Sequence, residues 1–304
     1  MVPDYYPRFC CTADRCRHSC CTMDWEIDID ADTYRLYGTV EGDLGRRLRD
    51  GIDHTAAPPH FRFTADRRCP LLNENGLCDL ITALGEGALC DICRDHPRFR
   101  NFFSDRIEVG LGLCCEEACR LILENTDTVR LIEIDDDGGN ETLTEEETAF
   151  LTWRDGIFAI LQDRSKPFWE RAAALSVAYQ LPRMPQDPSQ TIDFYRSLER
   201  LDPEWDGYLD RHAAWDRRRH EPDVPDTAWE QLSVYLVLRH TADGLDDGRL
   251  RERLAFCLHA ASFIYDMCIA LNADFAEMQN ICRLYSGEIE YSDDNMEKLL
   301  AWFS

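Results

Sequence analysis

The stretch Phe9-Cys10-Cys11-Thr12-Ala13-Asp14-Arg15-Cys16-Arg17-His18-Ser19-Cys20-Cys21 decides the character of the first part of this chain, because it holds five cysteines in thirteen residues. Three further groups follow it: Cys69 and Cys78; Cys90 and Cys93; and Cys114, Cys115 and Cys119. Secreted disulfide scaffolds are usually short chains that follow a signal peptide. The N-terminus has no basic segment followed by an apolar run, so we expect a cytoplasmic protein whose cysteines bind metal.

The spacing of the cysteines restricts the kind of metal centre. Thiolates select zinc, cuprous copper or iron–sulfur clusters over hard cations. A zinc ribbon requires two C-x₂-C pairs, and only Cys90 and Cys93 have that form. The adjacent residues Cys20 and Cys21 fit best where each sulfur serves a different metal, or a different iron of one cluster. Isolated cysteines such as Cys257 are expected to be buried and inert.

Composition excludes several classes of protein. The chain has 304 residues, 44% of them hydrophobic, which is enough for a folded core. Its net charge of −25 argues against general nucleic-acid binding, which requires clustered lysine and arginine. No run of 18 apolar residues is present, so we expect no membrane-spanning segment.

The patterns along the chain predict an α+β fold that is mostly α. Residues 1–125 are expected to form a small, irregular, cysteine-rich metal or iron–sulfur domain with short strands, such as Trp25–Asp30, and a hairpin turn at Asn75-Gly76. Residues 126–304 are expected to form a helical domain. Helical periodicity covers 145–163, 167–181, 189–201, 226–241, 247–271, 273–285 and 293–302.

These motifs resemble, in order, those of the flagellin lysine-N-methylase family (FliB-type). The N-terminal resemblance lies in Cys11-x₄-Cys16-x₃-Cys20-Cys21, then Trp25-x-Ile27-x-Ile29-Asp30, and then the block from Cys69 to Cys78. Cys93-x₃-Pro97-Arg98 and Leu113-x-Cys115-x-Glu117-Ala118 continue it. The helical half contributes the segment from Trp229 to Arg239 and the segment from Tyr285 to Asn295. The N-terminal block is also similar to the broader CxxCxxCC group of zinc- or iron-chelating proteins.

The resemblance implies transfer of a methyl group from S-adenosylmethionine to lysines of flagellin or of another lysine-bearing protein, with an iron–sulfur cluster of the 4Fe-4S type, or zinc as the alternative. The metal ligands that it implies are Cys11, Cys16, Cys20, Cys21, Cys69, Cys78, Cys93 and Cys115, which we call the framework cysteines. Cys10, Cys90, Cys114 and Cys119 are additional to the family pattern. We expect Arg94 and Arg98 to flank the metal site and offset its negative charge.

The candidate catalytic residues are Glu288, Glu290 and Tyr285, because a carboxylate or tyrosine can relay the proton that a lysine must lose. The alternative is that they form a solvated acidic surface. No glycine-rich loop identifies the residues that bind S-adenosylmethionine, and we expect its pocket in a cleft between the two domains. The competing interpretation of the whole chain is a non-catalytic zinc- or iron-chelating or iron–sulfur scaffold protein.

Overall fold

The computed structural model describes residues 1–22, 25–135, 141–182, 188–215 and 221–303. The chain forms two compact units. The cysteine unit comprises Cys10–Arg98 and Cys115–Glu117, and the helical unit comprises Met1–Phe9, Phe99–Cys114 and Ala118–Ser304. The division therefore does not follow a single boundary at residue 125: the chain enters the helical unit first, leaves it, and returns to it twice.

The cysteine unit is built from short elements around one apolar cluster. These are α1 (Ala31–Thr39), α2 (Gly42–Gly51), β2 (Ile52–Asp53), β3 (His60–Phe61), α3 (Asp79–Leu84) and α4 (Asp91–Asp95). β2 and β3 pair antiparallel, and Asp28 forms an isolated bridge to His60. The cluster includes Ile27, Leu48 and Phe61, all almost fully buried, and the cysteines Cys69 and Cys90. Cysteine side chains thus form part of the core itself.

The helical unit confirms the mostly helical prediction. Its strands are β1 (Val2–Pro3), β4 (Arg98–Phe103), β5 (Arg106–Leu111) and β6 (Leu131–Ile132), with β1 paired to β6 and β4 to β5. Its helices are α5 (Glu116–Leu123, whose first two residues belong to the cysteine unit), α6 (Glu145–Leu161), α7 (Phe168–Ala178), α8 (Pro188–Ser197), α9 (Glu204–Ala213), α10 (Asp226–His240), α11 (Gly244–Asp247), α12 (Leu250–Leu271), α13 (Phe275–Tyr285) and α14 (Asp293–Trp302). Helix α9 lies outside the predicted helical ranges, because charged residues interrupt the apolar pattern of its sequence.

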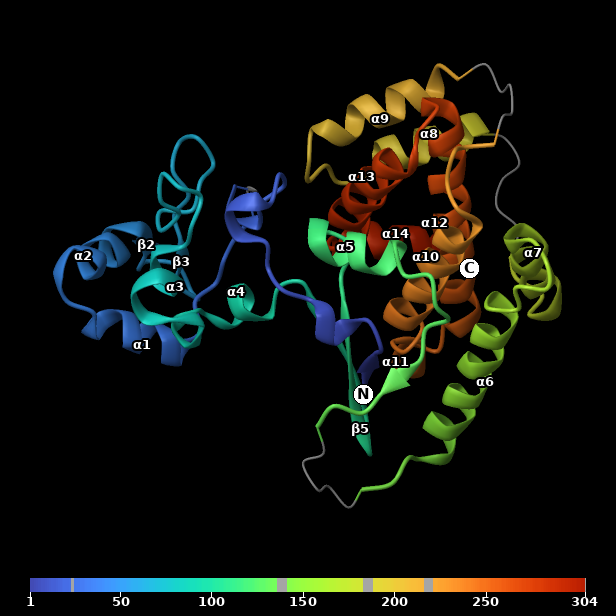
Figure 1. Ribbon diagram of the computed structural model, residues 1–304, viewed down its shortest axis with the longest axis horizontal. Helices are drawn as coiled ribbons and strands as arrows, with labels where there is room; N and C mark the ends of the chain where they lie inside the picture. Colours follow the sequence, from blue (N-terminus) through green and yellow to red (C-terminus); the bar gives the residue numbers. More distant parts are fainter. Residues whose placement is uncertain (23–24, 136–140, 183–187, 216–220, 304) are drawn as a thin grey trace. The chain divides into compact units, whose positions relative to one another are not determined.

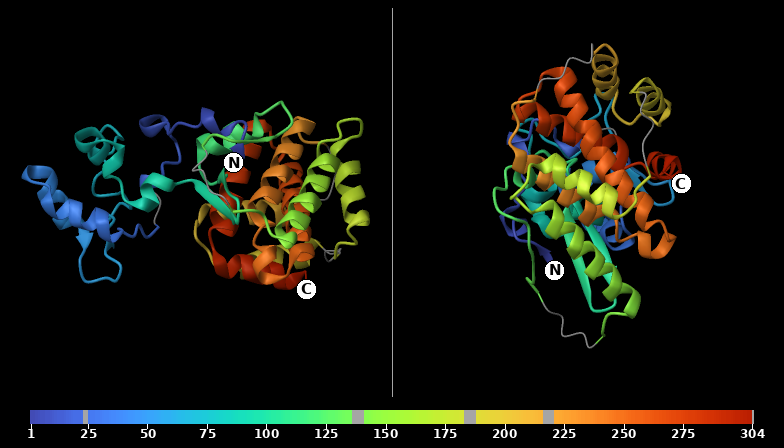
Figure 2. Two further views of the ribbon diagram at one scale, coloured as in Figure 1. Left: turned by 90° about the horizontal axis from the view of Figure 1, so that it is seen from below. Right: turned by 90° about the vertical axis from the view of Figure 1, so that its right-hand side faces the viewer.

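Helices α10 and α12 form the centre of the helical unit. They pack against each other, while α9, α13 and α14 contact α12 and the neighbouring helices α6 and α7 contact α10 (Figures 1 and 2). Within the described ranges, α12 is the one helix long and apolar enough to cross a membrane, and 61% of its apolar window is buried inside the protein. That burial is typical of a core helix.

A turn of π-helix, Ser286–Glu290, continues α13, and Ser292 then begins α14 by accepting a hydrogen bond from the Asn295 backbone N–H. Single π turns inside helices occur frequently at functional sites. This one carries two of the candidate catalytic residues, Glu288 and Glu290, and both are buried.

The buried ion pair between Arg154 of α6 and Glu108 of β5 yields a prediction about stability. Two hydrogen bonds of 2.6 and 2.7 Å join the two side chains, which are 1% and 3% exposed. Glu108→Ala leaves the guanidinium buried and unpaired, so we expect unfolding to become easier by about 3 to 5 kcal/mol. Urea denaturation followed by circular dichroism measures this change.

The matched control is Glu297→Gln, which removes an exposed partner of Arg249 and should cost at most about 1 kcal/mol. The double variant Glu108→Leu/Arg154→Met should recover most of the lost stability. An equal loss in Glu108→Ala and Glu297→Gln would contradict the prediction.

Candidate functional site

All eight framework cysteines lie in the cysteine unit, although Cys115 is far from the others in sequence. The segment Cys115–Glu117 belongs to this unit while the residues on either side of it belong to the helical unit. The additional Cys114 and Cys119 fall in the helical unit, where the buried Cys119 thiol donates to the carbonyl of Gln279 at 3.3 Å. Cys10 and Cys90 remain with the framework.

One group of framework cysteines packs on the apolar cluster of the cysteine unit. Its members are Cys21, Cys69, Cys78 and Cys93, joined by the additional Cys90. The backbone N–H of Cys69 donates to the carbonyl of Cys21 at 2.8 Å, which holds two distant segments together. Burial, followed by the thiols of Cys21 and Cys78, raises the pKa of Cys69 to about 12. The thiols of Cys21 and Cys78 therefore lie close enough to Cys69 to change its pKa.

A second group forms around Cys20 and Cys115. A hydrogen bond to the Cys21 thiol, followed by burial, raises the pKa of Cys20. The thiols of Cys11 and Cys115 raise that pKa further, which places both within electrostatic reach of Cys20. Cys11 acts in the same way on Cys16. The hydrogen-bonded thiols of Cys20 and Cys21 thus connect the two groups, and the expectation that each sulfur serves a different metal stays a prediction.

The carboxylate of Glu116 ties the second group together. Its Oε2 atom accepts hydrogen bonds from the backbone N–H groups of Arg17 and His18 at 3.0 and 3.2 Å, and the Cys16 thiol lies 3.9 Å away. Burial would raise the pKa of Glu116, but the bonds from His18 and Arg17 outweigh it, and the pKa is lowered. Glu116 therefore fixes the loop of Cys16 beside Cys115.

No three of the framework thiols, all of which lie in described residues, are within 4.8 Å of one another, although pairs of cysteines such as Cys20 and Cys21 are in contact. Four sulfurs bound to zinc at about 2.3 Å lie roughly 3.8 Å apart. Among the described residues, the group of three or more His, Cys, Asp or Glu whose ligand atoms all lie within 4.8 Å of one another is Glu26, Asp28 and His60, without a cysteine. A cluster, in which each thiolate binds a different iron, separates the sulfurs more than a single ion does.

Arg94 and Arg98 follow Cys93 but are engaged with other groups. Arg94 pairs with the carboxylate of Asp91, and its side chain is half exposed. Arg98 donates to the carbonyl of Arg94 at 3.1 Å. Their expected role beside a metal centre stays a prediction.

The helical unit holds a buried carboxylate network centred on Glu290. Its Oε2 atom accepts a 2.5 Å hydrogen bond from the Tyr235 hydroxyl. The same oxygen lies 3.0 Å from His240 Nε2 and 3.1 Å from Arg239 Nε. The Tyr235 hydroxyl in turn accepts from Arg239 Nη1 at 3.0 Å and from the backbone N–H of Leu113 at 3.2 Å. The orientation of the tyrosine proton toward Glu290 is therefore fixed.

The two oxygens of Glu290 are used unequally. Oε2 interacts with the side chains of Tyr235, Arg239 and His240, whereas the buried Oε1 has no hydrogen-bond partner among the described residues. Burial would raise the pKa of Glu290, but Arg239 and His240 outweigh it and the pKa is lowered. Burial likewise lowers the pKa of His240, against the pull of Glu290. Glu290 is consequently an ionised carboxylate, and one of its two buried oxygens has no donor among the described residues.

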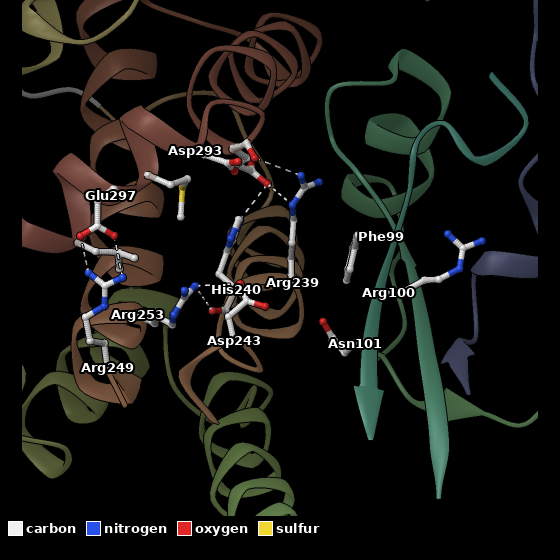
Figure 3. Close-up of a pocket in the computed structure, with 13 residues that line it drawn as sticks. Phe99, Arg100, Asn101, Arg239, His240, Asp243, Arg249, Arg253, Asp293 and Glu297 are labelled. Carbon is white, nitrogen blue, oxygen red and sulfur yellow. Dashed lines mark hydrogen bonds and ion pairs between the residues drawn. The ribbon is translucent and has the colours of Figure 1, made fainter. Parts of the chain in front are cut away.

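Glu290 lines a cavity of about 360 Å³. Its wall includes the ring of Phe99 from β4, the arginines Arg239, Arg249 and Arg253, and residues of α14 (Figure 3). The Arg239 guanidinium lies over the rings of Phe99 and Tyr291, at 5.4 and 4.6 Å from their centres. Gly110 makes room for Phe99, since a Cβ atom at position 110 would lie 2.2 Å from that ring.

The other two candidate catalytic residues have different surroundings. Both oxygens of Glu288 accept hydrogen bonds, from Arg200 Nη1 at 2.6 Å and from the backbone N–H groups of Leu201 and Asp202. The hydroxyl of Tyr285 lies 3.2 Å from that of Tyr195, which lies 3.1 Å from His259 Nε2. Neither residue lines the cavity. The alternative of a solvated acidic surface is wrong, because all three candidates are buried.

Sequence reasoning did not single out Tyr235, Arg239 and His240. The signal was present, since Tyr235 and Arg239 lie in the segment from Trp229 to Arg239 that carries part of the family resemblance. Their role depends on the contact of α10 with the π turn, fifty residues away in sequence, and periodicity along one helix does not reveal such a contact.

Comparison with known proteins confirms the resemblance to lysine-N-methylases. The chain is 28% identical to a lysine-N-methylase of Salmonella typhimurium over an alignment of 145 positions, which covers 43% of this chain and 34% of that protein. It is 27% identical to a lysine-N-methylase of Salmonella choleraesuis. It is 28% identical to the flagellar biosynthetic protein FliU of Salmonella muenchen, of which 80% is covered.

The chain is thus a homologue of these enzymes over part of its length, and it spans about a third of the length of the two lysine-N-methylases. No protein-family model and no solved structure matches it.

A buried series of hydrogen-bonded side chains, Tyr285–Tyr195–His259, predicts that the stability of the fold depends on pH. Burial lowers the pKa of His259 from 6.5 to about 3. As the pH falls, His259 takes up a proton in the unfolded chain at its ordinary pKa, before it does so in the folded protein. The contribution of neutral His259 to folding stability is therefore complete above pH 6.5 and is lost as the pH falls toward 3. One proton gives a slope of about 1.4 kcal/mol per pH unit.

We therefore expect urea denaturation at pH 6.5, 5.5 and 4.5 to show a smaller loss of stability in His259→Gln than in the unsubstituted protein. A glutamine retains a polar partner for Tyr195 without the titration. Identical pH dependence in both proteins would contradict this assignment.

Proposed function

We propose that this chain is a lysine N-methyltransferase that transfers a methyl group from S-adenosylmethionine to a lysine of another protein, with flagellin as the first candidate. The observation that carries the proposal is its similarity to proteins named lysine-N-methylase and to a flagellar biosynthetic protein. A cytoplasmic location follows, because flagellin synthesis and its cofactor supply are there.

The framework cysteines would hold the metal centre of this enzyme. The donor set fits an iron–sulfur cluster, since thiolates are its protein ligands, and fits zinc as the alternative. Their gathering in one unit, in two groups that the hydrogen-bonded thiols of Cys20 and Cys21 connect, supports one centre with more than one metal ion. A cluster with an open iron would bind the amino and carboxylate groups of S-adenosylmethionine, and a fully ligated centre would hold the surrounding loops in place.

The transfer requires a neutral amine held in line with the sulfonium. A lysine ammonium, with a pKa of about 10.4, first loses a proton to solvent. The nitrogen lone pair then forms a bond to the methyl carbon while the carbon–sulfur bond breaks, and its electrons stay on sulfur as a thioether. Of the three candidate residues, Glu290 is favoured for a place at this reaction because it lines a cavity. Glu288 and Tyr285 are favoured as buried supports.

The alternative is a non-catalytic iron–sulfur or zinc scaffold. The cysteine unit would suffice for chelation, whereas a buried carboxylate with a free oxygen beside a cavity in the other unit has no use in chelation. This contrast favours the enzyme.

Methyl transfer tests the proposal directly. Protein purified without oxygen should transfer label from methyl-labelled S-adenosylmethionine to flagellin, and flagellin with chemically acetylated lysines should receive none. Absence of transfer, together with no affinity for S-adenosylmethionine at millimolar concentration, would leave the scaffold alternative.

Metal content provides a separate test. Anaerobic protein should contain iron and acid-labile sulfide, and Cys93→Ser should reduce both because it removes a framework thiolate. The matched control Cys119→Ser changes a buried cysteine of the helical unit and should retain the full content. Stoichiometric zinc without sulfide would replace the cluster with a zinc centre, and equal loss in both variants would contradict the framework.

A further inference from the structure

We infer that the cavity beside Glu290 in the helical unit is the binding site for the ammonium group of the substrate lysine, with Glu290 Oε1 as its acceptor. This rests on the proposed function for the identity of the substrate. It goes beyond that function by placing the substrate side chain at named residues.

The first argument is the unpaired oxygen. Buried carboxylate oxygens almost always have hydrogen-bond donors, and leaving one without a donor is costly. The side chain of Glu290 is fully buried, Oε1 has no partner in the described part of the chain, and the donors that reach the carboxylate there lie at Oε2. A ligand N–H group is the complement that this arrangement lacks.

The second argument is the charge of the cavity. Arg249 is paired with Glu297 and Asp247, and Arg253 with Asp243 and Asp247. Arg239 is held by Glu290 and Tyr235. These three arginines already have anionic or hydroxyl partners, and Arg100, the fourth arginine of the wall, is also engaged, whereas Oε1 of Glu290 is buried with no donor among the described residues. The cavity therefore favours a cation that donates hydrogen bonds over an anion.

The third argument is the shape and composition of the wall. Phe99, Met296 and Leu300 supply apolar surface beside the acidic group. The aliphatic stem of a lysine packs on such surface while its ammonium group reaches a polar partner. A sulfonium fits less well, because its sulfur has no hydrogen to donate to Oε1.

The rigid position of the Glu290 carboxylate supports binding of the lysine ammonium. The Tyr235 hydroxyl, Arg239 and His240 fix Oε2 from one helix, and the rings of Phe99 and Tyr291 lie against the Arg239 guanidinium. Figure 3 shows Arg239, His240 and Phe99 beside the cavity. Such preorganisation reduces the entropy that is lost when a ligand binds.

Binding of a lysine analogue to the full-length, metal-loaded protein tests the inference. Nα-acetyl-lysine amide, titrated by ligand-observed NMR without S-adenosylmethionine, should bind at least tenfold more tightly than Nα-acetyl-norleucine amide, which has the stem without the ammonium. Equal affinity of the two compounds, or binding of neither, would overturn the inference without any protein variant.

Glu290→Gln should weaken binding of the lysine analogue at least tenfold and leave the affinity for S-adenosylmethionine unchanged. The matched control is Glu230→Gln, another fully buried glutamate with arginine partners, which does not line the cavity. Loss of S-adenosylmethionine affinity in Glu290→Gln, with the lysine analogue still bound, would overturn the inference.

The two proposals fail in different ways. If flagellin is methylated at full rate by Glu290→Gln, the enzyme stands and this lysine site is wrong. If the analogue binds through Glu290 but no methyl transfer occurs, the cation site stands and the methylase is wrong.

Discussion

The burial of the Glu290 carboxylate is the constraint on which the centre of the helical unit depends. An ionised carboxylate inside a protein is tolerated only when charges and hydrogen bonds compensate for lost water. Here the compensation comes from Arg239, His240 and Tyr235, all on α10, while the carboxylate comes from the π turn after α13. The Tyr235 hydroxyl extends the network to the backbone of Leu113. One charge thus fixes three segments that are far apart in sequence.

The π turn explains how two neighbouring glutamates serve different purposes. Glu288 accepts hydrogen bonds from the backbone N–H groups of Leu201 and Asp202, between α8 and α9, and from the side chain of Arg200. Both of its oxygens therefore have donors. Glu290 keeps one oxygen free beside a cavity. A sequence that shows both as acidic residues in one motif does not distinguish them. The difference arises from which helix each side chain meets, and that is a tertiary property.

Much of the architecture could be predicted from residue patterns. The helices α6 and α10 lie within ranges that the sequence predicts to be helical, and α6 begins with a capping box of Thr144 and Glu147. The twelve cysteines before residue 120 indicated that the first part of the chain binds metal and differs from the rest. The return of Cys115–Glu117 to the cysteine unit was not predictable, because the flanking residues pack elsewhere. The cavity could not be predicted from the sequence either, because its walls come from β4, α10, α12 and α14, and no local sequence pattern relates those segments.

Similarity to known enzymes and the geometry of the site constrain function in complementary ways. Identity of 28% over part of the chain supports a reaction class but assigns no residue. The structure distinguishes the candidate residues by their partners: among the described residues Glu290 Oε1 has no donor, whereas Glu288 and the cavity arginines are paired. A methyl acceptor lysine is both cationic and long-stemmed, and a buried anion beside apolar surface meets both properties. The lowered pKa of Glu290 makes it a weak proton acceptor and a strong partner for a cation. Under the proposed function, Glu290 binds and orients the substrate, and the proton leaves through solvent before the nitrogen attacks.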